Sequence, residues 1–181
     1  SQSQLMSFAD KVKGFDEEQL NGFISNLKGK LLELRYTDYL NSGELPVGYT
    51  AELAESVTQP GWDIQILGPD NEIVNQIQLK ATNSVDYIKG ALEKYPEIDI
   101  VSTDEVYSQL SLMGAAEQVQ ASGITDSELV GAIEAAVDDV DIDLDFDLPL
   151  LSLAIIAFTS YRIENLNIYQ KAHYAGKRAG K

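Results

Sequence analysis

The strongest constraint on the fold is a run of alternating apolar and polar residues between Pro60 and Thr82. Residues 62–67 read WDIQIL and residues 72–81 read EIVNQIQLKA. Period-two alternation is typical of β-strands that bury one face, and the GPDN between the runs contains residues that favour tight turns. The segment therefore predicts a β-hairpin. On its second strand, one face carries Ile77, Leu79 and Ala81, and the other carries Gln76, Gln78 and Lys80.

The flanking segments predict that this hairpin belongs to an α/β core. Residues 15–41 have apolar side chains at helical spacing, which predicts a long helix. The stripe consists of Leu20, Phe23, Ile24, Leu27, Leu31 and Leu34. The YTAELAESV of residues 49–57 favours a short helix. Residues 85–95 favour another helix, ended by Pro96, and the IDIVS of residues 98–102 favours a strand. Helices alternating with strands in this way indicate an α/β fold.

The rest of the chain is expected to extend this core within a single domain. Residues 108–123 favour a helix, and Thr125 to Glu128 form a capping-box pattern before another helix. Residues 138–149 alternate Asp with apolar residues, as a half-exposed strand does. Residues 148–158 favour a buried helix, because this apolar run is shorter than the roughly 20 residues that span a bilayer. We expect the α/β core at about 15–105, a helical and acidic extension at about 106–148, and an apolar helix with a basic tail at 149–181.

Composition excludes several kinds of chemistry. The 181 residues include no Cys and one His, so disulfides, Cys-containing zinc clusters, multi-His metal sites and Ser-His pairs are excluded within one chain. The N-terminus lacks the features of a signal peptide, and together with the absence of Cys this favours a cytoplasmic location.

The charge of the chain is strongly uneven. The net charge is −16; from residue 149 onward, five basic side chains and one acidic side chain give +4, which leaves −20 for the rest. Such a field repels nucleic acid over most of the surface. Any nucleic-acid site therefore has to be local.

The hairpin contains a candidate site. Gln78 and Lys80 share a face, and a tight turn brings Asp63 opposite residues 76–78, so the three polar groups are expected to converge. Carboxylate and amide oxygens suit Mg²⁺ or Mn²⁺, and an ammonium group beside them can orient water or neutralise developing phosphate charge.

These residues resemble a known superfamily. Gly61-Trp62-Asp63 followed by Gln78-Leu79-Lys80 is similar to the PD-(D/E)XK restriction-endonuclease-like superfamily, and specifically to the branch with Gln at the acidic position, as in type IV restriction enzymes. The resemblance covers about residues 29–103. It implies metal ligation by Asp63, Gln78 and Leu79, catalysis by Lys80, and assistance from Glu33 on the leading helix. The chain departs from the family at two points, since no clear first strand precedes Trp62 and Gln78 is neutral.

Less specific interpretations stand beside this one. The polar hairpin face could be an ordinary solvated face, and Glu33 could simply pair with Lys30. The DIDLDFD of residues 141–147 lacks the Gly and the closing Glu of a calcium loop. The C-terminal GKRAGK is too short for a phosphate-binding loop, and His173 is expected on the surface.

Two functions are consistent with the sequence. The first is a Mg²⁺- or Mn²⁺-dependent nuclease that acts on nucleic acid, DNA more than RNA. It would need a local basic groove, which the C-terminal tail or a partner subunit in a homo-oligomer could provide; clustering of Arg35, Lys80, Lys89, Arg162 and Lys171 would support it. The alternative is a catalytically inactive acidic module, of the inhibitor or immunity type, that binds a basic partner. A third and weaker reading is the head of a larger membrane protein.

Overall fold

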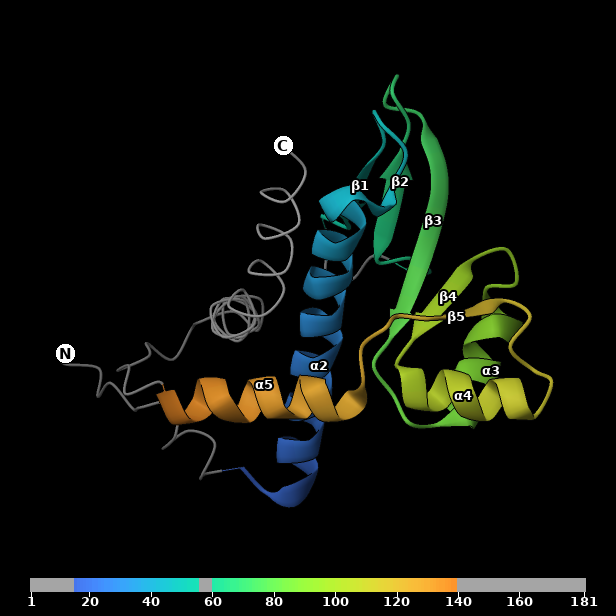
Figure 1. Cartoon of the computed structure of the whole chain (residues 1–181). Coiled ribbons are helices and arrows are strands. Elements are labelled where there is room, and N and C mark those ends of the chain that lie inside the picture. The colour runs from blue at the N-terminus through green and yellow to red at the C-terminus, as the bar shows by residue number, and fades with distance from the viewer. Residues whose placement is uncertain (1–14, 56–59, 140–181) are drawn as a thin grey trace, which may run out of the picture.

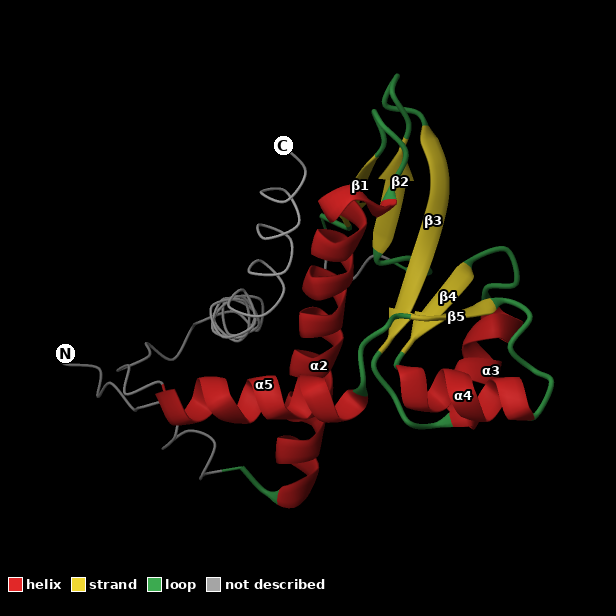
Figure 2. Cartoon of the chain, viewed as in Figure 1, coloured by secondary structure: helices red, strands yellow, loops and turns green. Residues whose placement is uncertain are grey.

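The computed structural model describes residues 15–55 and 60–139 and shows a mixed α/β fold (Figure 1). Five strands form one sheet in the order β1-β2-β3-β4-β5. Within the described residues, four α-helices accompany the sheet, and Figure 2 shows that they lie on both sides of it. The α/β class predicted from the sequence is confirmed.

The first half of the sheet is antiparallel. It contains β1 (Thr50–Leu53), β2 (Ile64–Leu67) and β3 (Ile73–Lys80). In the predicted hairpin, Ile64 pairs with Ile77. The turn closes because the Asn71 N–H donates to the Gly68 carbonyl at 3.0 Å, and Asn71 has a φ of 60°, a conformation that Asn tolerates better than most residues. The hairpin prediction is confirmed.

The second half of the sheet is parallel. β3 pairs with β4 (Asp99–Ser102), which pairs with β5 (Val119–Ala121). Parallel strands need crossover connections, and α3 (Val85–Lys94) and α4 (Asp104–Leu112) supply them. Ser84 caps α3, since its hydroxyl accepts the Tyr87 N–H at 3.2 Å.

The long leading helix is confirmed as α2 (Glu17–Tyr39). Asp16 and Gln19 cap its start reciprocally, at 2.8 and 3.1 Å, and a π-helical turn, η1 (Leu40–Glu44), follows its end. Its buried apolar side chains are Leu27, Leu31, Leu32 and Tyr36. The buried stripe is thus rotated from the predicted one: Leu32 and Tyr36 join it and Leu34 is only half-buried.

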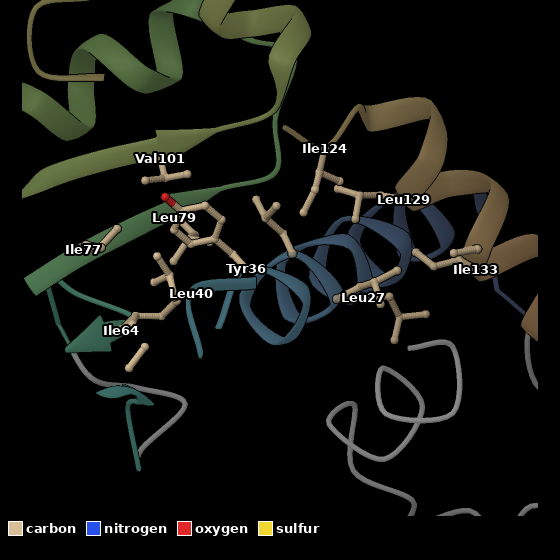
Figure 3. Packing of buried hydrophobic residues seen from close by; sticks show 14 of the residues in the cluster. Leu27, Tyr36, Leu40, Ile64, Ile77, Leu79, Val101, Ile124, Leu129 and Ile133 are labelled. Atoms are coloured by element: carbon tan, nitrogen blue, oxygen red, sulfur yellow. The ribbon is translucent and has the colours of Figure 1, made fainter. Parts of the chain in front are cut away.

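Two hydrophobic clusters cover the two faces of the sheet. On one face, α2 and α5 (Asp126–Asp139) pack against strand residues that include Ile64, Ile77, Leu79 and Val101 (Figure 3). On the other face, Ile88 of α3 and Val106 of α4 pack with Ile100. The capping box predicted before α5 is present: Thr125 and Glu128 bond reciprocally at 2.8 and 3.1 Å.

Two predicted elements are wrong. Residues 50–53, expected in a short helix, form the edge strand β1, in which Ala51 pairs with Ile66. The predicted helix 108–123 ends at Leu112 as α4, and its last part contains β5. In both cases a segment too short to show a clear period is recruited by the edge of an existing sheet.

Other predictions fall outside the described residues. Most of the acidic strand predicted at 138–149 lies there, because α5 ends at Asp139 and the described residues end with it. The apolar helix predicted at 148–158, the basic tail and His173 also lie there. Among the helices of residues 15–55 and 60–139, none is long and apolar enough to cross a membrane.

Candidate active site

Asp63 lies directly before β2 and is tied to β3 at two points. Its N–H donates to the Ile77 carbonyl at 2.9 Å, and its carboxylate Oδ2 accepts the Leu79 N–H at 2.7 Å. β3 continues past the point where β2 begins, so the Leu79 amide takes the Asp63 side chain as partner in place of another strand. Asp63 therefore lies beside Gln78, as the hairpin register predicted, and its second oxygen, Oδ1, makes no hydrogen bond within the described part.

Gln78 is buried rather than solvated. Only 6% of its surface is exposed, and its Oε1 has no hydrogen-bond partner among the described residues. An unsatisfied buried carbonyl costs about 1–3 kcal/mol, so this oxygen is a conspicuous acceptor. The interpretation of the polar strand face as an ordinary wet surface is therefore wrong at Gln78.

Lys80 is the last residue of β3 and is half-buried. Its Nζ lies 5.3 Å from the centroid of the Tyr87 ring on α3. Gln78 and Lys80 alternate with Ile77 and Leu79, which belong to the α2-side cluster, so both point toward the α3 side. The Lys80 ammonium forms no hydrogen bond or ion pair with any residue that the structure describes, and its donors are available to a ligand.

Glu33 comes from α2 and joins the site electrostatically. Its carboxylate is held by Lys30 Nζ, at 3.0 Å from Oε1 and 2.7 Å from Oε2. Burial raises the pKa of Glu33; Lys30 opposes this, the Asp63 carboxylate raises the pKa further and Lys80 lowers it. Because charge interactions weaken with distance, Glu33 lies within electrostatic reach of Asp63 and Lys80. The pairing with Lys30, weighed as an alternative, is present as well.

The available donors suit a hard cation. Asp63 and Gln78 offer oxygen atoms without protein partners, and oxygen ligands are those that Mg²⁺ prefers. Leu79 has an aliphatic side chain without donor atoms, so only its backbone carbonyl could ligate. Within residues 15–55 and 60–139, no group of three His, Cys, Asp or Glu side chains is arranged to hold a metal. A metal here would depend on the Gln78 amide oxygen.

The cations expected to form a groove are only partly placed for one. Arg35 is 9% exposed and lies in the buried face of α2, so it offers little to an external ligand. Lys89 is half-buried on α3, while Arg162 and Lys171 lie outside the described residues. Among the three members of the predicted set that the structure describes, Lys80 is the one placed in the site.

Sequence reasoning missed the Tyr87 ring beside Lys80. Tyr87 lies seven positions after Lys80, on the next element of the chain. Only the crossover from β3 into α3 brings the two together. No local pattern in the sequence could have indicated the contact.

Comparison with known proteins finds no matching family model, no matching curated protein and no matching solved structure. Interpretation of the site therefore depends on its own geometry and chemistry.

Proposed function

We propose that this chain is a metal-dependent nuclease of the restriction-endonuclease-like class, which hydrolyses phosphodiester bonds of nucleic acid. The observation that carries the proposal is the buried Gln78 Oε1, which has no hydrogen-bond partner among the described residues. Gln78 directly precedes Leu79, whose N–H binds the Asp63 carboxylate, and lies two positions before Lys80 on β3. The element order also supports it: the resemblance implies a core of a helix, a β-hairpin, a helix and a strand, and α2, the β2–β3 hairpin, α3 and β4 follow one another in that order.

Each residue has a distinct role in this proposal. Asp63 Oδ1 and Gln78 Oε1 would hold Mg²⁺ or Mn²⁺, with the Leu79 carbonyl as a third ligand. The bound cation would polarise the scissile phosphate and lower the pKa of a water molecule. Lys80 would orient the attacking water and stabilise charge that develops on the phosphate. Glu33, which Lys30 holds on α2, would assist through its negative charge or through an intervening water molecule.

The hydrogen bond from Leu79 to Asp63 preorganises the site. It fixes one carboxylate oxygen at 2.7 Å from a backbone amide, which leaves the other oxygen free for a ligand. Held groups lose less entropy when a substrate binds, so a fixed carboxylate is a better ligand than a mobile one.

The test is cleavage of supercoiled DNA, single-stranded DNA and RNA in Mg²⁺ and in Mn²⁺. We expect Asp63→Asn and Lys80→Met each to lower the rate at least 100-fold. Lys94→Met is the matched control, since Lys94 also lies over a tyrosine ring, at 5.1 Å from the Tyr95 centroid; it should cleave like the unmodified protein. Equal cleavage by all variants would indicate a contaminating nuclease and contradict the proposal.

A second candidate function follows from the charge. The described part contains few basic residues, namely Lys28, Lys30, Arg35, Lys80, Lys89 and Lys94. The many acidic side chains around them favour an inactive module that binds a basic protein. Absence of cleavage, together with unchanged partner binding by Lys80→Met, would support this alternative.

A further inference from the structure

Tyr87 presents a rigid aromatic surface next to the candidate site. Its side chain is 57% exposed, although its neighbour Ile88 is fully buried in the core. The Tyr87 N–H is bonded to the Ser84 hydroxyl that caps α3, so the backbone that carries the ring is held at a helix terminus. The Lys80 ammonium lies over the ring at 5.3 Å from its centroid.

Three of the six basic side chains in the described part are already engaged or buried. Lys28 pairs with Asp126 at 2.7 Å and Lys30 pairs with Glu33 at 2.7 Å, while Arg35 is buried. Duplex binding normally requires many lysines and arginines to neutralise phosphates on both strands. The described surface offers few cations for this purpose, and its acidic side chains repel a stiff polyanion.

Stacking offers an alternative source of affinity. Unpaired bases stack on aromatic side chains irrespective of sequence, whereas bases in a duplex have no free faces. A nucleotide whose phosphate contacts Lys80 would have its own base, or the neighbouring one, near the Tyr87 ring.

We propose that Tyr87 is a base-stacking residue that makes the site selective for unpaired nucleic-acid strands. This inference rests on the proposed nuclease function and specifies its substrate class. Tyr87 binds a base on its exposed side while Lys80 contacts the adjacent phosphate, so that one stacking contact replaces several phosphate contacts.

The experiment uses the full chain and three labelled probes in Mg²⁺ or Mn²⁺. The probes are a single-stranded oligodeoxynucleotide, the same strand annealed to its complement, and the same strand with a central run of abasic residues. The variants are Tyr87→Leu, Tyr87→Phe and the control Tyr39→Leu, which removes a tyrosine of similar exposure, 46%, at the end of α2. Anisotropy of the same probes in EDTA measures binding where metal-dependent cleavage is blocked.

The expected result is faster cleavage and tighter binding of the single strand than of the duplex. Tyr87→Leu should lower kcat/KM on the single strand about ten-fold or more and abolish the preference for base-containing over abasic strand. Tyr87→Phe and Tyr39→Leu should retain both. Preference for the duplex, no effect of Tyr87→Leu, or an equal loss on intact and abasic strands would overturn the inference; the last result would limit Tyr87 to positioning Lys80.

Failure of the proposed function has a different signature. If no probe is cleaved, the nuclease proposal fails. If, in addition, binding in EDTA shows no difference between strands or between Tyr87→Leu and the unmodified protein, the stacking inference fails independently.

Discussion

At the scale of single residues, Gln78 combines a cost to stability with the main evidence for a site. A buried amide oxygen without a partner lowers stability, and an apolar side chain of similar length would remove that cost. Natural sites often retain such unfavourable groups because a ligand needs them.

We therefore expect Gln78→Met to increase the free energy of unfolding, by about 1 kcal/mol, and to reduce metal-dependent cleavage strongly. Urea denaturation and a cleavage assay on the same preparation would measure both. A variant that is less stable and fully active would contradict this reading of Gln78.

Glu33 should make stability depend on pH in a direction unusual for a carboxylic acid. Burial raises its pKa from the ordinary value near 4.5, so the folded state binds a proton more tightly than the unfolded state. The corresponding stability is fully present below the unfolded pKa and is lost as the pH rises through the folded pKa.

Glu33→Gln removes this titration. Its stability relative to the unmodified protein should therefore increase as the pH is raised from about 4 and then level off at neutral pH. Thermal unfolding across that range provides the measurement. Glu93→Gln is the control, because Glu93 is an exposed residue of α3. Parallel pH profiles for the Glu33 variant and the unmodified protein would refute the prediction.

At the scale of elements, Asp126 at the start of α5 connects four parts of the fold. Its carboxylate bonds Lys28 of α2 at 2.7 Å and Asn83 of the β3–α3 connection at 3.0 Å. Its N–H donates to the Glu105 carboxylate of α4 at 2.9 Å. These contacts fix α5 against α2 at Lys28. Lys28 lies two positions before Lys30, the residue that binds Glu33.

Loss of this contact should weaken α5 docking. The side chains of Lys28 and Asp126 are each 14% exposed, so we expect Asp126→Ala to cost about 1–3 kcal/mol of unfolding free energy. Lys28→Met combined with Asp126→Ala should cost less than the sum of the two single changes. A double-mutant cycle by urea denaturation tests this, and strict additivity would show that the pair is not coupled.

Element-scale interactions also explain the strand that the sequence did not indicate. The Asn41 side chain donates to the Ala51 carbonyl at 2.9 Å and accepts the Ala51 N–H at 2.8 Å. It thus satisfies the N–H and the carbonyl of Ala51 on the outer edge of β1. Unpaired backbone groups on an exposed strand edge would otherwise favour association with another chain. A contact between residues 41 and 51 across an irregular turn leaves no periodic signal.

At the scale of the whole molecule, charge should govern how activity responds to salt. The chain has a net charge of −16, and of the six cations of the described part, two are paired and one is buried. Salt weakens attraction at Lys80 and also screens repulsion from the acidic surface, so the two effects oppose each other.

We expect the plot of log kcat/KM against log salt concentration to have a slope shallower than about −2 for a single strand. Measurement between low and moderate ionic strength is sufficient. A steep negative slope would indicate an extended basic binding surface and would contradict both this prediction and the selectivity inferred for Tyr87.

The sequence by itself determined the elements whose signals are local. Alternation specified the hairpin and the shared face of Gln78 and Lys80, spacing specified α2, and the capping-box pattern located the start of α5. Local stereochemistry governs such features, so a single chain segment contains the information.

Only the tertiary structure decided the features that depend on distant partners. Pairing with β2 makes residues 50–53 a strand, packing of α2 on the sheet brings Glu33 within electrostatic reach of Asp63, and the crossover into α3 sets Tyr87 beside Lys80. Burial and long-range charge interactions are properties of packed surfaces rather than of short segments, which is why the candidate residues could be named from the sequence but their environment could not.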